Sequence, residues 1–526
     1  MPSTSPTERA PLDRSTPAPY GGVGFHRPLC PDGRGARAAE CREPCPERSR
    51  PFVLAVTIIA SAMAFIDGTI VTIALPALQT DLAAGFASLQ WVVNAYALLL
   101  GGLILIGGGA GDRFGRRRIL VMGVALFAAA SLVCALAPTI GVLIGARAVK
   151  GVGAALLVPQ SLAIIAAAFP KEIRGRAIGI WAGASAIALS MGPPLGGILI
   201  DTLGWRSVFW INLPLSALVI WLALAYVPES RDETARGPLD WSGGLMSMVA
   251  FGLLTVGLTL FAEMSEGAGM AVALLILGAI GLALFLVIES RTASPLMPLS
   301  LFSSRVFSGA NVLTLFLYGA LSGILFLLPF DLIEQRGLSA TQVGLTLLPF
   351  GAIVGTLSRA AGDWADRKGP RQPLVLGSML LAMAAAGMAL GIESYWLGVL
   401  APVLLMSLAM AIVAAPLTTA VMNAAPEAQS GAASGINNAV SRLAGLFAVA
   451  IVAAIASVVF ADAIEATGSL TAGSRFGALP VMEDPTRTLF EHAFRRAYAF
   501  ALGMVAVSSL LAALVAWLSI PTRRSD

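Results

Sequence analysis

Residues 108–117 read Gly-Gly-Ala-Gly-Asp-Arg-Phe-Gly-Arg-Arg, and residues 362–371 read Gly-Asp-Trp-Ala-Asp-Arg-Lys-Gly-Pro-Arg. Both stretches follow the pattern Gly-x-x-x-Asp-Arg-x-Gly-x-Arg, they start 254 positions apart, and long apolar segments flank each of them. A basic, glycine-rich turn at the same place in two hydrophobic regions indicates a duplicated membrane bundle. Duplicated bundles that bind a ligand at the bilayer midplane are mostly transporters.

The composition places most of the chain in lipid. Of its 526 residues, 57% are hydrophobic and only 12% are charged, whereas soluble domains carry about 25% charged residues. The net charge of +4 is small, and the basic residues cluster between apolar runs, which argues against nucleic-acid binding. The spacing of Cys30, Cys41 and Cys45 near His26 fits no strong zinc pattern, so neither a metal nor another cofactor is expected.

Fourteen apolar segments are long enough to cross the membrane as helices, which predicts an all-α integral membrane protein. They are expected at 52–78, 88–111, 118–138, 141–168, 175–200, 206–227, 240–262, 268–290, 307–331, 339–362, 372–392, 395–422, 431–460 and 494–520. We assign 52–227 and 306–520 to two six-helix halves and 228–305 to an inserted helix pair. Residues 1–51 are expected to form a disordered tail, 521–526 a short tail, and 461–493 an outer loop that is a candidate lid.

Positive charge predicts the orientation of these segments. With the N-terminus inside, the inner loops hold most of the basic residues, and the short outer loops hold only Arg206 and Arg336. Loops rich in Lys and Arg face the cytoplasm. Both termini are therefore expected to be cytoplasmic.

Five motifs in chain order resemble those of the major facilitator superfamily, and within it the fourteen-helix drug:proton antiporter branch. They are the repeated turn after the second segment, Ile66–Pro76 in the first, Arg147–Gly153 in the fourth, Gly183–Gly197 in the fifth, and Trp205–Pro214 at the start of the sixth. The chain departs from the family pattern at Thr72, where Asn is usual, and at Lys150, where Gln is usual.

The resemblance implies the major facilitator fold, with two pseudosymmetric six-helix halves and two inserted helices, in a bacterial cytoplasmic (inner) membrane. It implies a proton-coupled secondary transporter that exports lipophilic, cationic drugs or toxic compounds by alternating access. The expected partners are a small-molecule substrate, protons and the lipid bilayer. A monomer is expected, alone or with accessory efflux proteins.

Other functions stay open from the sequence. A transporter of a metabolite, siderophore or lipid, working by symport or flipping, is the main alternative, and a non-transporting receptor is a weaker one. An enzyme is not expected, because neither a Gly-x-Ser-x-Gly elbow in a suitable context nor a His-Glu-x-x-His pair is present.

Asp67 is the main candidate for proton coupling because it lies near the middle of the first segment. A carboxylate there costs about 3 kcal/mol or more unless it is paired or hydrated. Burial favours its protonated form and an arriving cation favours its ionised form, so a proton and a cationic drug would compete for this site. The alternative is a carboxylate that only pins two helices together.

Arg147 and Lys150 lie three positions apart in the fourth segment and therefore share a helix face. The resemblance ties Arg147 to proton coupling, with a fixed positive charge near Asp67 favouring its ionised form. A structural charge pair is the alternative. Lys150 either extends to the membrane boundary or adds local positive charge.

Two groups of residues are candidates for gating. In the fifth segment, Pro193 removes a backbone donor, and the small residues Gly192, Gly196 and Gly197 allow close helix approach. In the repeated turns the candidates are Asp112, Arg113, Gly115, Arg116, Asp366 and Arg367. By pseudosymmetry, Asp112 is expected near Ser430 and Asp366 near Arg174, where each would meet a helix N-terminus and latch the cytoplasmic side. Gly111 is assigned no role, and a solvated loop that only sets the topology is the alternative.

Polar and aromatic side chains within the apolar segments are candidates for substrate contacts. They are Trp91, Asn94, Tyr96, Asn311, Tyr318, Asn437 and Arg442. Aromatic rings can hold a cation through cation–π contacts. Arg442 is expected either to pair with Asp331 or Glu334 or to contact an anionic substrate.

Overall fold

The computed structural model describes residues 47–231, 241–262, 268–292, 297–426, 430–465 and 484–522. Residues 1–46 of the predicted tail at 1–51 lie outside the described residues, and so do the three N-terminal cysteines. Fourteen helices in the described ranges are long and apolar enough to cross a membrane, which confirms the predicted number and order of spans. The protein is therefore a multi-pass membrane protein.

The N-terminal half contains one long helix for each of the first five predicted spans, and two helices for the sixth. They are α1 (Arg50–Asp81), α2 (Phe86–Phe114), α3 (Arg116–Ala135), α4 (Ile140–Ala168), α5 (Lys171–Leu203), α6 (Ser207–Trp210) and α7 (Asn212–Tyr226). The break between α6 and α7 falls beside Pro214, which has no backbone N–H to donate to the preceding turn.

The rest of the chain contributes the inserted pair and the second half. The elements are α8 (Trp241–Ala262), α9 (Ala268–Arg291), η1 (Leu299–Ser303), α10 (Arg305–Phe330), η2 (Asp331–Gln335), α11 (Ala340–Lys368), α12 (Arg371–Ala389), η3 (Trp396–Leu400), α13 (Ala401–Asn423), α14 (Ser430–Glu465) and α15 (Asp484–Ser519). The expected outer loop at 461–493 is wrong at both ends, because α14 continues to Glu465 and α15 begins at Asp484. The Phe460 and Phe490 rings pack 4.9 Å apart, so the last residue of the predicted span in α14 contacts the part of α15 that precedes its predicted span.

The packing repeats the duplication seen in the sequence. In the first half α2 and α3 both pack on α4, and in the second half α11 and α12 both pack on α13. The signature turn joins α2 to α3 in one half and α11 to α12 in the other. The two halves meet through α5 against α11 and through α2 against α14.

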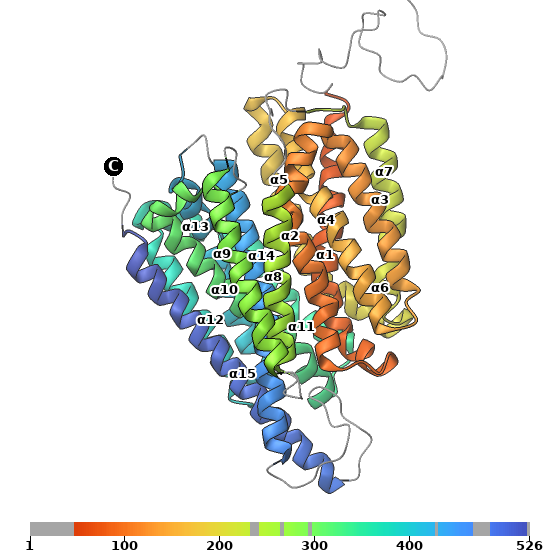
Figure 1. Ribbon diagram of the computed structural model, residues 1–526, viewed down its shortest axis with the longest axis vertical. Helices are drawn as coiled ribbons and strands as arrows, with labels where there is room; N and C mark the ends of the chain where they lie inside the picture. The colour runs from red at the N-terminus through yellow and green to blue at the C-terminus, as the bar shows by residue number, and fades with distance from the viewer. Residues whose placement is uncertain are drawn as a thin grey trace, which may run out of the picture. The chain divides into compact units, whose positions relative to one another are not determined.

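The inserted pair lies beside one of these two contacts. Figure 1 shows α8 running between α2 and α14, with α9 next to α8, and α8 packs on all three helices. Only 17% of the apolar window of α9 is buried inside the protein, so most of this helix is left to face lipid.

The bundle has two different ends. We call the end that carries the two signature turns the turn end, and the opposite end the far end. One buried apolar cluster joins far-end residues of the first half, such as Ile70 and Leu89, to the core of the second half, such as Leu313 and Val343. A second cluster, around Val53 and the other turn-end residues of the first half, contains residues of that half alone. The hydrophobic core therefore joins the halves at the far end.

Contacts along α5 and α11 locate the point where the halves separate. A methyl group added to Gly351 of α11 would overlap Ser190 of α5. Gly183 of α5 and Gly355 of α11 lie at least one helical turn closer to the turn end than Ser190 and Gly351. A methyl group added to either glycine would meet no atom within 4 Å. The two helices thus touch in their far-end parts and diverge toward the turn end.

Candidate functional site

Asp67 forms the centre of a buried charge cluster. One oxygen of its carboxylate, Oδ2, accepts a hydrogen bond from the Arg147 guanidinium, and the other, Oδ1, accepts one from the Lys150 ammonium. All three side chains are at most 1% exposed. Because α1 packs directly on α4, the acid from one helix meets both bases from the other. Each carboxylate oxygen therefore has a cationic partner, as a buried charge requires.

Aromatic rings and a backbone carbonyl hold the two bases in place. The Arg147 guanidinium lies 4.3 Å from the centre of the Tyr96 ring, and its Nε donates to the Val92 carbonyl at 2.9 Å. The Lys150 ammonium lies 4.5 Å from the Phe127 ring centre and 5.0 Å from that of Phe209. Cation–π contacts of this kind are strongest where water is excluded, so the rings stabilise both charges inside the N-terminal half.

The cluster differs from the site expected from the sequence in one respect. Arg147 lies beside Asp67 as expected, and it shares a helix face with Lys150. Of the two alternatives for Lys150, extension to the membrane boundary is wrong and added positive charge beside Asp67 is what the structure has, because its ammonium binds Asp67. Sequence reasoning left Lys150 out of the coupling site. The signal that points to it is its position one helical turn after Arg147 on the same face.

Gly151 keeps α2 close enough for Tyr96 to lie under Arg147. A methyl group at Gly151 would lie 2.6 Å from the Tyr96 carbonyl oxygen and 3.0 Å from the Leu99 Cβ. The Tyr96 hydroxyl also donates to the Ala64 carbonyl at 3.0 Å, so the same side chain joins α2 to α1. Close packing at Gly151 therefore positions the ring on which Arg147 rests.

Replacing Gly151 with alanine is expected to destabilise the protein by about 1–3 kcal/mol, because the added methyl group forces α2 away from α4. Gly145→Ala on the same helix is the matched control. A methyl group there meets no atom within 4 Å, so this change is expected to be neutral or stabilising by up to about 1 kcal/mol. Thermal unfolding of the purified variants in detergent measures both effects. Equal melting temperatures for the two variants would contradict the packing argument.

The glycines of α5 face two different helices. Added methyl groups at Gly192 and Gly196 would meet Thr69 and Ile70 of α1. One at Gly197 would overlap the Ala340 carbonyl of α11 and lie 2.7 Å from the Thr341 Cα. Near Pro193 the α5 backbone lies against Gly344 of α11. These residues therefore lie where α5 is packed between the first half and the second, and their role in gating stays a prediction.

At the turn end, the first signature turn is anchored to the residues that follow α7. The Glu229 carboxylate accepts the backbone N–H groups of Arg117 at 3.0 Å and Arg118 at 3.2 Å, and the Ser230 carbonyl accepts that of Arg116 at 2.9 Å. These are orphan donors of the first turn of α3. Gly115 has φ +108°, and a side chain there would overlap Glu229. Sequence reasoning missed Glu229 and Ser230, although an acid directly after the sixth span was a signal for a capping partner.

The latch expected for Asp112 is not made in this conformation. Its carboxylate accepts hydrogen bonds from Arg116 at 2.8 and 3.0 Å, and the Asp366 residue in the second turn is exposed. The halves diverge at the turn end. Both latch contacts therefore stay predictions for a conformation in which the turn end is closed. Gly111 has a packing role that the sequence did not reveal, because a methyl group there would overlap the side chain of Gln160, whose amide donates to the Gly107 carbonyl at 2.7 Å.

The candidate substrate residues fall into several groups. Asn437 donates to Asn311 at 3.3 Å and to Thr314 at 2.8 Å, which joins α14 to α10. Tyr96 belongs to the charge cluster. Asn94 is fully buried, and neither of its side-chain amide atoms has a hydrogen-bond partner among the described residues. Trp91 and Tyr318 are half-buried.

Arg442 lies at the contact between the halves. Its guanidinium lies 5.9 Å from the ring centre of Phe65, a residue of α1 that precedes Asp67 by two positions. A methyl group added to Gly101 of α2 would lie 3.2 Å from the Arg442 Cβ. The expected ion pair with Asp331 is wrong, because Asp331 binds Arg336 at 2.9 Å. No hydrogen bond or ion pair is found for Arg442 within the described ranges, so this base from α14 approaches α1 without an acidic partner there.

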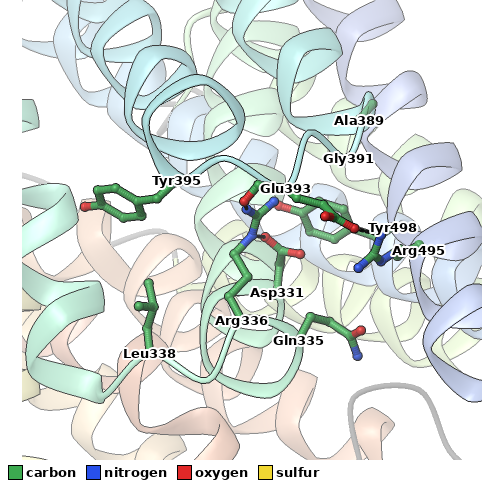
Figure 2. A pocket seen from close by; sticks show the side chains of 10 residues that line it. All are labelled: Asp331, Gln335, Arg336, Leu338, Ala389, Gly391, Glu393, Tyr395, Arg495 and Tyr498. Atoms are coloured by element: carbon green, nitrogen blue, oxygen red, sulfur yellow. Dashed lines mark hydrogen bonds and ion pairs between the residues drawn. The ribbon is translucent and has the colours of Figure 1, made fainter. Parts of the chain in front are cut away.

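A separate polar pocket of about 310 Å³ lies at the far end of the second half. Figure 2 shows Asp331 and Arg336 side by side in it, with Tyr498 close to them. Arg336 also donates to the carbonyls of Ile392 and Glu393. These bonds hold η2 against the segment that joins α12 to α13, which gives the cluster a structural role at the end of the bundle.

The sequence profile of the Major Facilitator Superfamily matches residues 57–449. The chain belongs to this superfamily. The match covers most of both halves, including the Asp67 cluster, and it confirms the family resemblance of the sequence motifs. The protein is therefore a member of a superfamily of membrane transporters for small molecules.

Similar proteins include several resistance proteins of actinobacteria. The multidrug resistance protein Stp of Mycobacterium tuberculosis is 37% identical over 393 residues, which cover 74% of this chain and 73% of that protein. The lincomycin resistance protein of Streptomyces lincolnensis is 34% identical, covering 80% and 88%. The puromycin resistance protein pur8 of Streptomyces alboniger is 33% identical, covering 92% and 94%.

Solved structures with low sequence identity share the fold. An inward-facing, occupied bacterial homologue of the human lysosomal transporter Spinster matches with a TM-score of 0.64 at 17% identity, over 90% of this chain and 97% of that one. A D-xylose–proton symporter matches with a TM-score of 0.60 at 18% identity, over 91% and 99%. At such identities these likenesses establish the major facilitator fold alone.

Proposed function

We propose that this chain exports lipophilic drugs or other toxic compounds across a bacterial cytoplasmic membrane and takes up protons in exchange. The observation that carries the proposal is the buried cluster of Asp67, Arg147 and Lys150 at the contact between α1 and α4. Ionisable groups within membrane spans mark ion and substrate pathways. The resemblance to drug-resistance proteins of the same superfamily supports drugs as the cargo.

The charge distribution supports a cytoplasmic turn end. The basic residues of both signature turns lie there, and so do the first residues of α1 and the last of α15. Because positively charged loops stay inside, both chain ends are assigned to the cytoplasm. The conformation described here is then inward-facing, closed at the outer far end and open at the inner turn end. The protein works as a monomer in this proposal, and an accessory efflux protein is not required for it.

Alternating access follows from the two helix pairs that join the halves. Opening the far end requires α5 to leave α11 around Gly197 and Gly344, and closing the turn end brings the signature turns toward the other half. Asp112 and Asp366 would then reach helix N-termini, where a carboxylate gains about 0.3–1 kcal/mol. The halves rock about the charge cluster, which lies between the two ends.

The charge of the cargo is a separate question. The expectation of a cationic cargo depended on competition between a proton and the cargo for Asp67, whose two oxygens both bind bases of the protein in the structure. When all three groups are ionised the cluster carries a net charge of +1, and Arg442 approaches from the second half. The positive charge of Arg442, which is independent of the protonation of the cluster, attracts an acidic group on the cargo more than a basic one.

Arg442→Gln is expected to lower the affinity for fluorescein about tenfold, or about 1.4 kcal/mol, and to leave that for rhodamine 123 unchanged or higher. The two dyes share a ring system, and one is anionic whereas the other is a fixed cation. Fluorescence-polarisation binding to purified protein measures both affinities. Arg495→Gln, at an exposed position of the far end, is the control. Equal losses for both dyes would mean that Arg442 has a packing role instead.

Reconstituted vesicles test the proposed function. Purified protein is inserted into liposomes, a pH gradient is imposed in either direction, and the movement of puromycin, lincomycin and tetracenomycin C is followed together with internal pH. We expect uphill drug movement opposite to the proton flow, abolished by a proton ionophore. Movement in the same direction as the protons would favour symport. No gradient-dependent movement of any of the three drugs would reject proton-coupled drug export.

A further inference from the structure

Lys150 is the feature of the charge cluster that the family pattern does not explain. The family usually has Gln at this position, whereas here a fully buried ammonium binds Asp67 and lies over the Phe127 and Phe209 rings. A buried lysine without a function is costly, because its charge must be desolvated. What Lys150 contributes to the exchange of protons for cargo depends on the net charge of the cluster in each protonation state.

Two protonation changes are available to the cluster, and their consequences differ. A proton added to Asp67 would neutralise the acid and leave Arg147 and Lys150 as two uncompensated buried cations. Loss of a proton from Lys150 would leave the Arg147–Asp67 ion pair intact and bring the net charge from +1 to zero. Uncompensated buried charges cost several kcal/mol each. Arginine keeps its proton in proteins, whereas buried lysine can release one, so Lys150 is the member that exchanges a proton at the lower cost.

The surroundings of Lys150 also suit an uncharged amine. The Ser131 hydroxyl of α3 is fully buried and has no hydrogen-bond partner among the residues described. Ser131 lies four residues after Phe127, whose ring centre is 4.5 Å from the ammonium. Residues at this spacing share a helix face. No hydrogen bond joins Ser131 to Lys150 in this conformation. We expect the hydroxyl, which lies on the face of α3 turned toward Lys150, to donate to the amine once the amine is neutral.

The groups around Lys150 leave few other proton carriers. Asp67 faces it from α1 and Arg147 from its own helix, while Cys134 faces it from α3. The Tyr96 hydroxyl of α2 is already donating to the Ala64 carbonyl. Arg442 adds positive charge from the second half, where its guanidinium lies 5.9 Å from the Phe65 ring centre. Each additional cation raises the cost of placing a further proton on Asp67.

We propose that the proton exchanged for cargo is carried by Lys150, and that Asp67 and Arg147 form a permanent ion pair that positions it. In the inward-facing conformation the Nζ–H bond breaks and the proton passes to water at the open turn end, leaving a neutral amine. In the outward-facing conformation the amine takes a proton from external water, which restores the ammonium and its bond to Asp67. The proposal rests on the proposed function, because it assumes proton-coupled export.

The decisive variant is Lys150→Arg, which preserves the charge and a donor for Asp67 but cannot release its proton. In the vesicle experiment, with puromycin, lincomycin and tetracenomycin C as probes, we expect Lys150→Arg to retain drug binding and downhill movement. Uphill export driven by the pH gradient should fall at least tenfold, to the level of Lys150→Gln. A purely structural role of Lys150 would instead be rescued by arginine. Gradient-driven export by Lys150→Arg at the wild-type rate would overturn the proposal.

Ser131→Ala provides a second measurement that does not depend on how the arginine variant folds. Loss of the hydroxyl removes the partner of the neutral amine, so proton release is favoured less and the pH of half-maximal export should shift upward. Ser378→Ala is the control, since Ser378 is equally buried but donates to the Leu374 carbonyl in the other half. An unchanged pH profile in Ser131→Ala would count against the proposal. A wild-type protein that exports none of the three drugs would reject the proposed function itself.

Discussion

Asp67→Asn is expected to abolish gradient-driven export and to lower the free energy of unfolding by about 3–5 kcal/mol, the cost of removing one partner from a buried ion pair. The asparagine side chain cannot compensate two cations that are both at most 1% exposed. Efflux from reconstituted vesicles measures the first effect, and the melting temperature of the purified protein measures the second.

Asp81→Asn is the matched control for this change. Asp81 also binds an arginine, Arg206, at 2.9 Å, but both side chains are more than 40% exposed at the far end. Exposed pairs contribute about 0–1 kcal/mol, so this variant should remain stable and active. Adding Lys150→Gln to Asp67→Asn should recover part of the lost stability without restoring coupling, because it removes one uncompensated charge. Full export by Asp67→Asn would exclude Asp67 from the mechanism.

Gly197→Val is expected to have the largest effect on the conformational cycle. A single methyl group at Gly197 already overlaps the Ala340 carbonyl of α11, so the larger side chain would separate α5 from α11 at the far end. The inward-facing conformation loses its outer closure, and export should fall by at least tenfold. A cysteine introduced at Ser190, which is 8% exposed, should become reactive toward an impermeant maleimide added at the outer face.

Gly503→Val in α15 controls for the change of residue type. A methyl group there meets no atom within 4 Å, so export and outer-face labelling should match the parent protein. If Gly197→Val protein were labelled no faster than its parent, the α5–α11 contact would not be the outer closure.

Much of the fold was accessible from the sequence. The fourteen spans were identified from hydropathy, and the repeated turn predicted the duplication that the packing of α4 and α13 displays. The position of Arg147 near Asp67 was expected from the family resemblance of the motifs in the first and fourth spans, and the structure brings the two together. The ends of α14 and α15 were misplaced, because the residues that extend them, up to Glu465 and from Asp484, include charged side chains that give no hydropathy signal.

Other parts of the site depended on contacts between residues far apart in the chain. The binding of Glu229 to the start of α3 joins residues more than a hundred positions apart. An ion pair with Asp331 was one of two alternatives for Arg442, but Asp331 binds Arg336 instead. The Glu229 contact depends on how whole helices are placed, whereas the Asp331–Arg336 pair is local, five residues apart, and was overlooked.

The sequence alone determined the number of spans, their order, the duplication and the presence of an acid in the first span, because hydrophobic length and motif repetition are local properties of the chain. Only the tertiary structure decided that Lys150 shares Asp67 with Arg147, and that the halves touch at the far end and separate at the turn end. These features depend on which side chains meet when α1 packs on α4 and α5 on α11. Which side chains meet depends on how closely the helices pack. Glycines allow close packing, but their positions in the sequence do not by themselves specify which helices come together.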